Sequence, residues 1–482
     1  MKKACLISLS ALWMTPVVWA AGLEGQWQGN LDVGLTKFRV ALVLQKASRG
    51  KIKGTFNNID DGLYGLPLQK LRTDGAFLHA KLKSGEGLEL QLSADGSALD
   101  GNYIQAHGHF QKEGKTSALH LTRGVSFLVP RIGPNGKAVK DYVYTVPQKL
   151  EDGWEIGDLR ESVKNIRQVE GAVKKILSAS YPRIHSLQVT RHGKLVLDEY
   201  FYGYGPSDPH PLQSITKSVF SILFGIAQDQ KFLQLNQKLY DGFPLYRSGV
   251  TWQAEKNKIT LKMLLTMTSG FNCDDWKAKR PCSWQMVDSP DWVDFSLSQY
   301  LSQPPGTHFS YCGACLTSLS ALLDRYSGMS VPAFAQQNLW APLGIPKPVW
   351  MEGPGPVTPA SFGLSLRPRD LAKIGQLVLN QGKWGEKQIV SADWIQESTS
   401  IQIPKAGTNE KDDYGYLWWE RNLSIHGETM RVVYAWGVGG NYLFIVPKLE
   451  LVCVVTAGNY DSAELGANSF KLFQDQLLGA VF

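Results

Sequence analysis

The stretch Gln213-Ser214-Ile215-Thr216-Lys217-Ser218-Val219-Phe220 carries the pattern that decides the fold of this chain. From Val219 to about Gln228 nearly every residue is apolar, which predicts a helix buried on all sides in a large domain. Ser214 and Lys217 stand three residues apart, so both side chains lie on one face of the first helical turn. A hydroxyl and an amine at the start of a buried helix have no obvious structural purpose.

The chemistry of this Ser–Lys pair indicates a nucleophile and its base. Burial lowers the proton affinity of an amine, so a neutral Lys217 can take the proton of Ser214. The free N–H groups and the positive dipole end at the helix start favour a developing oxyanion. The alternative is an ordinary N-cap serine followed by a lysine that reaches the surface. Because the S-x-x-K spacing also occurs in the polar stretch 48–51, the motif alone does not decide.

Length and composition are those of an ordinary soluble protein. The chain has 482 residues, of which 43% are hydrophobic and 19% charged, and its length predicts roughly two to four domains. The formal net charge of +7 falls to +5 once Lys2 and Lys3 are removed, and the excess is spread along the chain. Such a diffuse charge favours solubility and gives no reason to expect a nucleic-acid partner.

Residues 1–20 have the features of a signal peptide. Lys2 and Lys3 precede an apolar run, and Val18-Trp19-Ala20 offers small residues at the cleavage positions. An uncleaved anchor, the alternative, needs a longer apolar span. We therefore expect no stable membrane insertion and a mature protein that is periplasmic or secreted.

Five cysteines follow the signal segment. In an oxidising compartment, Cys273 and Cys282 could form a disulfide across a loop rich in polar and aromatic residues. Cys312 and Cys315 stand at the expected start of a helix, and whether they are bridged stays open. Cys453 lies in an apolar strand and is expected to be a buried free thiol. No histidine cluster accompanies these residues, so we expect neither a metal nor another cofactor.

Hydrophobic patterning divides the rest of the chain into three parts. Residues 22–124 show short alternating runs separated by Gly, Asp and Asn, which predicts a small all-β accessory domain. Residues 125–165 contain several prolines and no clear period, so they are interpreted as a linker. Residues 166–482 have two strands early, at 184–190 and 194–201, and three strands late, with helices between them. One short helix is predicted over 259–270, ending at Gly270, which can take the left-handed conformation. A last helix is predicted over 465–478. This order predicts an α+β domain with one antiparallel sheet built from both ends of the segment.

The ordered motifs of this last part resemble those of the penicillin-recognising serine hydrolases, in particular the class C β-lactamase-like esterases and amidases. Ser214-Ile215-Thr216-Lys217 is similar to the nucleophile motif, and 264–270 is similar to a helix end of the family. The stretch 305–311, Pro-Gly-Thr-His-Phe-Ser-Tyr, looks like the approach to the second motif. Residues 435–440, Ala-Trp-Gly-Val-Gly-Gly, look like the third. The resemblance implies an antiparallel sheet flanked by helices plus a helical subdomain, with the site between them.

The resemblance also implies roles for particular residues. Ser214 attacks the acyl carbon, Lys217 helps to remove its proton, and Tyr311 is the second acid/base group. The backbone N–H groups of Ser214 and Val438 form the oxyanion hole. We expect the cationic lysine to favour the ionised form of the Tyr311 phenol. An ordinary core tyrosine and a plain Gly-rich hairpin are the alternatives. The residues expected to border the substrate are Gly313, Ala435, Trp436 and Gly437.

Two departures from the family pattern bear on the substrate. Members that act on β-lactams usually have Tyr-x-Asn, but here the third position is Gly313. They also carry a cationic residue at the start of the third motif, where this chain has Ala435. An ester or small amide without a required carboxylate is therefore the expected substrate, and Trp436 and Trp284 could provide apolar walls.

Two other functions stay open at this point. The first is a β-lactamase or D-amino-acid peptidase that acts on cell-wall peptides. The second is a catalytically silent peptidoglycan- or β-lactam-binding protein on the same fold. The sequence does not fix the oligomeric state.

Overall fold

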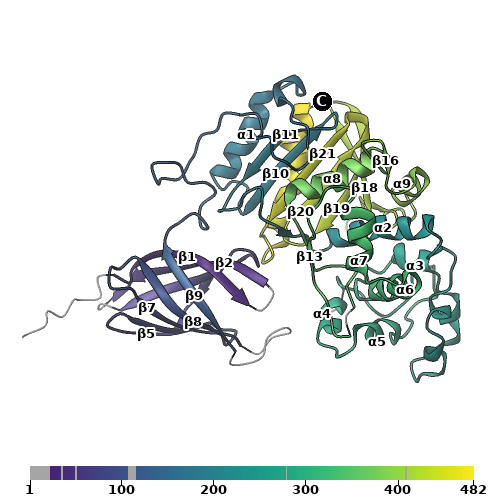
Figure 1. The fold of residues 1–482 in the computed structure, drawn as a ribbon, viewed down its shortest axis with the longest axis horizontal. Coiled ribbons are helices and arrows are strands. Elements are labelled where there is room, and N and C mark those ends of the chain that lie inside the picture. The colour runs from purple at the N-terminus through teal and green to yellow at the C-terminus, as the bar shows by residue number, and fades with distance from the viewer. Residues whose placement is uncertain are drawn as a thin grey trace, which may run out of the picture. The chain divides into compact units, whose positions relative to one another are not determined.

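The computed structural model describes residues 22–33, 36–48, 51–106, 115–277, 279–355, 357–407 and 410–481. By their contacts these residues form two compact units, which Figure 1 draws. The first unit contains the residues up to Asn57 and Tyr64–Val125, and the second contains Asn58–Leu63 and the chain from Ser126 onward. The predicted signal peptide, residues 1–20, lies outside the described residues.

The first unit is all β, as the alternating pattern predicts. Its nine strands form one sheet in the order β4-β3-β2-β1-β9-β8-β7-β6-β5, and β1 pairs antiparallel with both β2 and β9. Side chains alternate between buried and exposed along strands such as β6 and β9, so one face of the sheet forms the core. Its strands are β1 (Gly25–Val33), β2 (Thr36–Lys46), β3 (Ile52–Asn58), β4 (Leu63–Pro67), β5 (Gln69–Asp74), β6 (Phe77–Lys81), β7 (Gly87–Leu92), β8 (Ala98–Ile104) and β9 (Thr116–Arg123).

The core of this unit is built from leucines around one tryptophan. Trp27 is fully buried and its indole N–H donates to the carbonyl of Leu23 at 2.9 Å, so its polar atom is satisfied. Leu42, Leu78 and Leu121 are buried in the same cluster. These contacts account for the buried leucines and Trp27 as core residues.

The segment interpreted as a linker, residues 125–165, groups with the second unit from Ser126 onward. Trp154 is 1% exposed, and its indole N–H donates to the Arg369 carbonyl at 3.0 Å. The hydroxyl of Tyr142 donates to Glu199 at 2.6 Å. These tyrosine and tryptophan contacts attach the segment to the surface of the second unit, and its role as a linker between domains stays a prediction.

The second unit contains an antiparallel sheet built from both ends of its sequence, as predicted, but with five late strands where three were predicted. Its seven strands run in the order β11-β10-β21-β20-β19-β18-β17. β10, from the early part of the sequence, pairs antiparallel with β21, from the late part. This pairing joins the early and late strands into one sheet, as predicted. The strands are β10 (Ile184–Arg191), β11 (Lys194–Tyr200), β17 (Asp413–Tyr414), β18 (Trp419–Ile425), β19 (Glu428–Gly437), β20 (Asn441–Val446) and β21 (Leu451–Ala457).

Helices cover both faces of this sheet. Successive residues of a strand point to opposite faces, and Val452 of β21 packs against Gly375 of α8 (Pro368–Leu379), where an added Cβ would lie 2.5 Å from the valine. Its neighbour Cys453 instead lies against Val169 of α1 (Ile166–Leu177) and Leu477. The thiol of Cys453 is free and buried, as expected from its apolar strand.

The chain end that packs on the sheet differs in detail from the prediction. The sequence predicts one helix over 465–478, but the structure has α10 (Ala463–Gly466), α11 (Asn468–Lys471), a π-helical stretch (Leu472–Leu478) and α12 (Gly479–Val481). The π-helical stretch places the ring of Phe473 flat on that of Phe444, with the ring centroids 3.9 Å apart. The helical repeat is therefore irregular where Phe473 packs on the sheet.

A helical subdomain lies between the early and late strands, as the family resemblance implies. Its helices are α3 (Leu261–Leu265), α4 (Cys282–Val287), α5 (Trp292–Leu297), α6 (Thr317–Ser327) and α7 (Val331–Ala335). The helix predicted to end at Gly270 ends earlier, at Leu265, because Met267 has a positive φ of 56°. Gly270 does take the predicted left-handed conformation, with φ of 81°, and stands beyond the helix. Within the described residues, no helix has the length and apolar character needed to cross a membrane.

Short elements complete the second unit. They are β12 (His210–Pro211), β13 (Val349–Trp350), β14 (Leu364–Leu366), β15 (Lys383–Trp384), β16 (Lys387–Gln388) and α9 (Ala392–Ser398). The 3-10 turns are η2 (Leu159–Glu161), η3 (Leu239–Asp241), η4 (Pro244–Ser248), η5 (Ala254–Lys258), η6 (Ala314–Leu316) and η8 (Pro447–Leu449). A further π-helical turn is η7 (Gln336–Trp340).

Candidate active site

The predicted nucleophile stands at the start of α2 (Ile215–Asp229), which is buried along residues 215–227. Ser214 occupies the N-cap position of this helix, yet its side chain makes no capping hydrogen bond. The first N–H groups of the helix instead reach carbonyls three residues back, for example from Thr216 to Gln213 at 3.1 Å. The hydroxyl of Ser214 is therefore not used for capping, unlike that of an ordinary N-cap serine.

Lys217 points at the nucleophile. Its side chain is almost fully buried, and its Nζ lies 2.9 Å from Ser214 Oγ and 3.1 Å from the carbonyl of Ser361, with a hydrogen bond to each. Burial lowers the pKa of Lys217 to about 8, and the negative charge of Asp275 offsets part of that shift. A lysine in this state is a base near neutral pH, as predicted from the buried helix.

Tyr311 completes the cluster from the segment before η6. It is 4% exposed, its ring centroid lies 4.8 Å from Lys217 Nζ, and its phenol is hydrogen-bonded to Ser214. The expectation that the lysine favours the phenolate is wrong, because desolvation raises the pKa of Tyr311, and Asp275 adds to the rise. Tyr311 therefore stays a neutral phenol that can donate a proton.

The third motif approaches the nucleophile at the end of β19. Gly437 is required here because an added Cβ would lie 2.3 Å from the carbonyl oxygen of Leu212, two residues before Ser214. Val438 follows directly and is 49% exposed, and the turn continues through two glycines with positive φ. The Asn441 side chain donates to the Val438 carbonyl at 2.9 Å. The Ser214 and Val438 segments thus adjoin, and their role as an oxyanion hole stays a prediction.

Aromatic rings line the site beside Tyr311. Trp276 stacks on Tyr311 with ring centroids 4.4 Å apart, and Trp419 lies 5.8 Å from Trp276. Trp436, one of the predicted substrate neighbours, is partly buried with its ring 6.3 Å from Trp276. Trp284, the other suggested wall, lies on α4 and is half exposed, whereas Trp276 makes the ring contact with Tyr311.

Of the other two predicted substrate neighbours, Ala435 is buried on β19 and presents no charge to the site. Gly313 stands just after the catalytic tyrosine, and its backbone N–H donates to the Asp275 carboxylate at 3.0 Å. Of the two departures from the family pattern, the structure places Gly313 beside the cluster, where an added Cβ would lie 3.4 Å from Lys217 Nζ.

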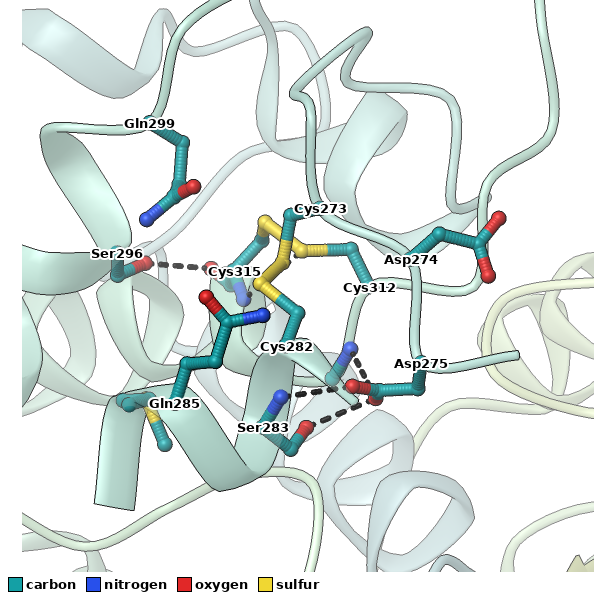
Figure 2. The surroundings of a disulfide bond; sticks show 12 residues. Cys273, Asp274, Asp275, Cys282, Ser283, Gln285, Ser296, Gln299, Cys312 and Cys315 are labelled. Carbon is teal, nitrogen blue, oxygen red and sulfur yellow. Dashed lines mark hydrogen bonds between the residues drawn. A yellow bond between two sulfur atoms is a disulfide. The ribbon is translucent and has the colours of Figure 1, made fainter. Parts of the chain in front are cut away.

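One disulfide closes the loop that carries Asp275, and a second disulfide lies beside it (Figure 2). Cys273 is bonded to Cys282, the pair expected from sequence, and Cys312 is bonded to Cys315. The Sγ atoms of Cys273, Cys282 and Cys312 lie within 4.8 Å of one another, but all three sulfurs are engaged in these disulfides. The first disulfide therefore ties the loop to the start of α4, and the second closes a turn within the segment after Tyr311.

A pocket of about 430 Å³ lies beside these disulfides. Its lining includes Cys273, Cys282, Lys277 and His308, but not Ser214. Lys217 and Tyr311 are also absent from this lining, so the pocket is distinct from the predicted Ser–Lys–Tyr site.

Sequence reasoning missed several residues of the site. Asp275, Trp276 and Ser361 reach the cluster only through tertiary contacts, for example the hydrogen bond from the Asp275 N–H to the Tyr311 carbonyl at 2.9 Å. The only sequence signal for the first two was their place inside the predicted disulfide loop.

The site combines a buried Ser–Lys pair at a helix start with a neutral phenol beside it and a glycine-rich turn at the sheet edge. This combination is typical of penicillin-recognising serine hydrolases. Residues 167–468, more than half of the chain, match the family model described as Beta-lactamase. The chain therefore belongs to the β-lactamase family and is a hydrolase of that fold. A serine acyl-enzyme mechanism is general for this family.

Several known proteins are similar to this chain. The 6-aminohexanoate-dimer hydrolase of Paenarthrobacter ureafaciens is 24% identical over 279 residues, which cover 54% of this chain and 69% of that protein. A Bacillus anthracis structure described as a 6-aminohexanoate-dimer hydrolase has a TM-score of 0.54 and 20% identity, covering 72% of this chain and 89% of its own. A family VIII carboxylesterase has a TM-score of 0.50 and 16% identity, covering 64% and 97%. The likeness to these two structures concerns the fold.

Proposed function

We propose that the protein is an exported serine hydrolase that cleaves an ester or a small amide bond through an acyl-enzyme on Ser214. The observation that carries this proposal is the 2.9 Å contact between Ser214 Oγ and the Nζ of buried Lys217, whose pKa is lowered to about 8. A hydroxyl in contact with a base whose pKa lies near the working pH is the arrangement that activates a nucleophile.

Acylation on this proposal starts with proton transfer. Lys217 Nζ takes the hydroxyl proton while Ser214 Oγ bonds to the carbonyl carbon of the substrate. The oxyanion that forms is received by the backbone N–H groups of Ser214 and Val438, each donor contributing about 10²–10³ in rate. Collapse of this intermediate then breaks the bond to the leaving oxygen or nitrogen.

Tyr311 is the proposed acid for the leaving group. Its phenol is neutral and hydrogen-bonded to Ser214, so it can give its proton to the departing atom and recover one from the Lys217 ammonium. In deacylation a water molecule loses a proton to the same pair and attacks the acyl carbon. Ser214 Oγ leaves with that proton, which restores the starting state.

The substrate class follows from what the site offers. Ala435 provides no cation, and the aromatic rings of Trp276 and Trp436 give an apolar wall. An uncharged acyl group suits such a surface better than a carboxylate does. The names of two similar proteins, a dimer hydrolase and a carboxylesterase, agree with amide and ester substrates.

Labelling by a neutral fluorophosphonate, followed by intact-mass measurement, tests the nucleophile. Wild type is expected to gain one adduct and Ser214→Ala none. Ser221→Ala is the matched control, because this serine lies on the same helix with a buried hydroxyl that has no partner, and the variant should label like wild type. An unlabelled but folded wild type would overturn the proposal in favour of a silent binding protein.

Turnover of a short-chain p-nitrophenyl ester is then compared with turnover of a chromogenic β-lactam. Faster ester hydrolysis, lost in Ser214→Ala, is the expected result. A preference for the β-lactam would assign the protein to the β-lactamase alternative. N-terminal sequencing of the mature protein tests export, with cleavage expected after residue 20.

A further inference from the structure

Position 313 holds a glycine because there is no room for a side chain, and not because of its backbone conformation. Its backbone is in the ordinary right-handed region, with φ of −67°, so another residue could adopt this conformation. An added Cβ, however, would lie 2.6 Å from Ser283 Oγ and 2.7 Å from Asp275 Oδ2. The volume of a side chain at position 313 is therefore already filled by the Asp275 carboxylate and the Ser283 hydroxyl.

The carboxylate of Asp275 is held there by three hydrogen bonds, as Figure 2 shows. Its Oδ1 accepts from the Ser283 N–H at 2.7 Å, and its Oδ2 accepts from the Ser283 hydroxyl at 2.8 Å and the Gly313 N–H at 3.0 Å. Its own N–H donates to the Tyr311 carbonyl. Three hydrogen bonds inside the loop closed by Cys273 and Cys282 fix this carboxylate more firmly than an exposed loop aspartate requires.

The carboxylate faces the catalytic cluster. The Cβ position at Gly313 lies 3.4 Å from Lys217 Nζ, so the same small volume adjoins both the carboxylate and the amine. The charge of Asp275 acts on both Lys217 and Tyr311. The other groups near Nζ are the neutral phenol of Tyr311 and the carbonyl of Ser361. The phenol of buried Tyr414 also interacts with Tyr311.

We propose that Asp275 is a positioning residue of the reaction, whose carboxylate takes the place of a side chain at Gly313 and provides the fixed negative charge opposite Ser214 and Lys217. This inference rests on the proposed Ser214 chemistry. The carboxylate stabilises the ammonium that forms on Lys217 during acylation. It also favours the ammonium before the reaction, so its removal extends activity to lower pH.

The test follows the rate of Ser214 labelling by a neutral fluorophosphonate between pH 5 and pH 10. In wild type, labelling should rise to half of its plateau near pH 8. In Asp275→Asn the midpoint should move down by about one pH unit, since a nearby opposite charge raises the pKa of an amine by about that much or more. The plateau rate should also fall about tenfold, because the ammonium formed during acylation loses its counter-charge.

Asp274→Asn is the matched control. Asp274 lies in the same loop, and its carboxylate accepts hydrogen bonds from Trp276, Lys277 and Ser310. Its removal should leave the midpoint unchanged. Gly313→Ala is a second variant that keeps the charge but displaces the carboxylate, so its midpoint should move in the same direction by less than that of Asp275→Asn.

The outcomes separate the two proposals. A wild type that does not label would overturn the proposed function itself. A wild type that labels, with the same midpoint in Asp275→Asn, Asp274→Asn and wild type, would overturn only the role of Asp275. A midpoint that moves down in Asp275→Asn but stays unchanged in Asp274→Asn supports the role of Asp275.

Discussion

Replacing Lys217 with Met should stabilise the protein while it removes activity. Lys217 is buried, and its pKa falls from 10.5 in the unfolded chain to about 8 in the folded protein. Each unit of this shift corresponds to about 1.4 kcal/mol, so a protonated Lys217 costs the folded state about 3 kcal/mol at pH 7. Methionine has a similar length and needs no proton, so it avoids this cost.

Part of that gain is lost with the hydrogen bonds of Lys217. The carbonyl of Ser361 and the hydroxyl of Ser214 each lose a donor, at about 1 kcal/mol for a typical bond. The net stabilisation of Lys217→Met at pH 7 should therefore be about 1 kcal/mol. Activity toward the ester should fall by about 10³-fold or more, because the base is gone.

Denaturant unfolding of both proteins at several pH values provides the assay. Between pH 8 and pH 10.5 the unfolded chain binds more protons at Lys217 than the folded protein, so wild-type stability rises with pH in this window. The advantage of Lys217→Met should be complete below pH 8 and fade toward pH 10.5. A variant that is less stable than wild type at pH 7, or an advantage that does not change with pH, would refute the reasoning.

Two further predictions concern the geometry and the base. The kcat/KM for a neutral ester should rise with pH to half of its plateau near pH 8, as the neutral form of Lys217 accumulates, and a flat profile from pH 6 to 9 would contradict this assignment. Gly437→Ala should lower kcat/KM by about 10²-fold, because the new Cβ would lie 2.3 Å from the Leu212 carbonyl and must displace the end of β19. In the matched control Gly171→Ala, on α1, the Cβ enters open space and activity should not change.

The sequence predicts the sheet and the central helix because their signals are local. A run that is apolar on every helix face predicts the buried α2. Short β-rich runs predict β10 and β11 within one residue of their observed ends. The order of two early and three late strands then predicts a single sheet. The end of α3 was misplaced because Gly270 is a strong stop signal, whereas the positive φ of Met267 is set by tertiary structure.

The site is only partly predictable for a related reason. The Ser–Lys pair and Tyr311 fall on recognisable motifs, but Asp275 and Trp276 join them through contacts between segments about 36 residues apart. The ionisation of Tyr311 was predicted in the wrong direction because sequence indicates a neighbouring lysine and not the degree of burial. Desolvation depends on every element that packs around a group, so it cannot be read from one motif.

Burial acts in opposite directions on the two titratable groups of the proposed mechanism, and this difference assigns their roles. It removes the proton from Lys217 and keeps the proton on Tyr311, so above pH 8 the site holds a neutral base and a neutral acid on either side of Ser214. Acylation then creates an ammonium on Lys217 beside the fixed carboxylate of Asp275. The counter-charge is thus in place before the charge appears, and its attraction is greatest when the proton has moved, which is the condition for stabilising a transition state more than a ground state. On this reasoning, the glycine at position 313 is part of the mechanism, because any larger residue there would displace that carboxylate.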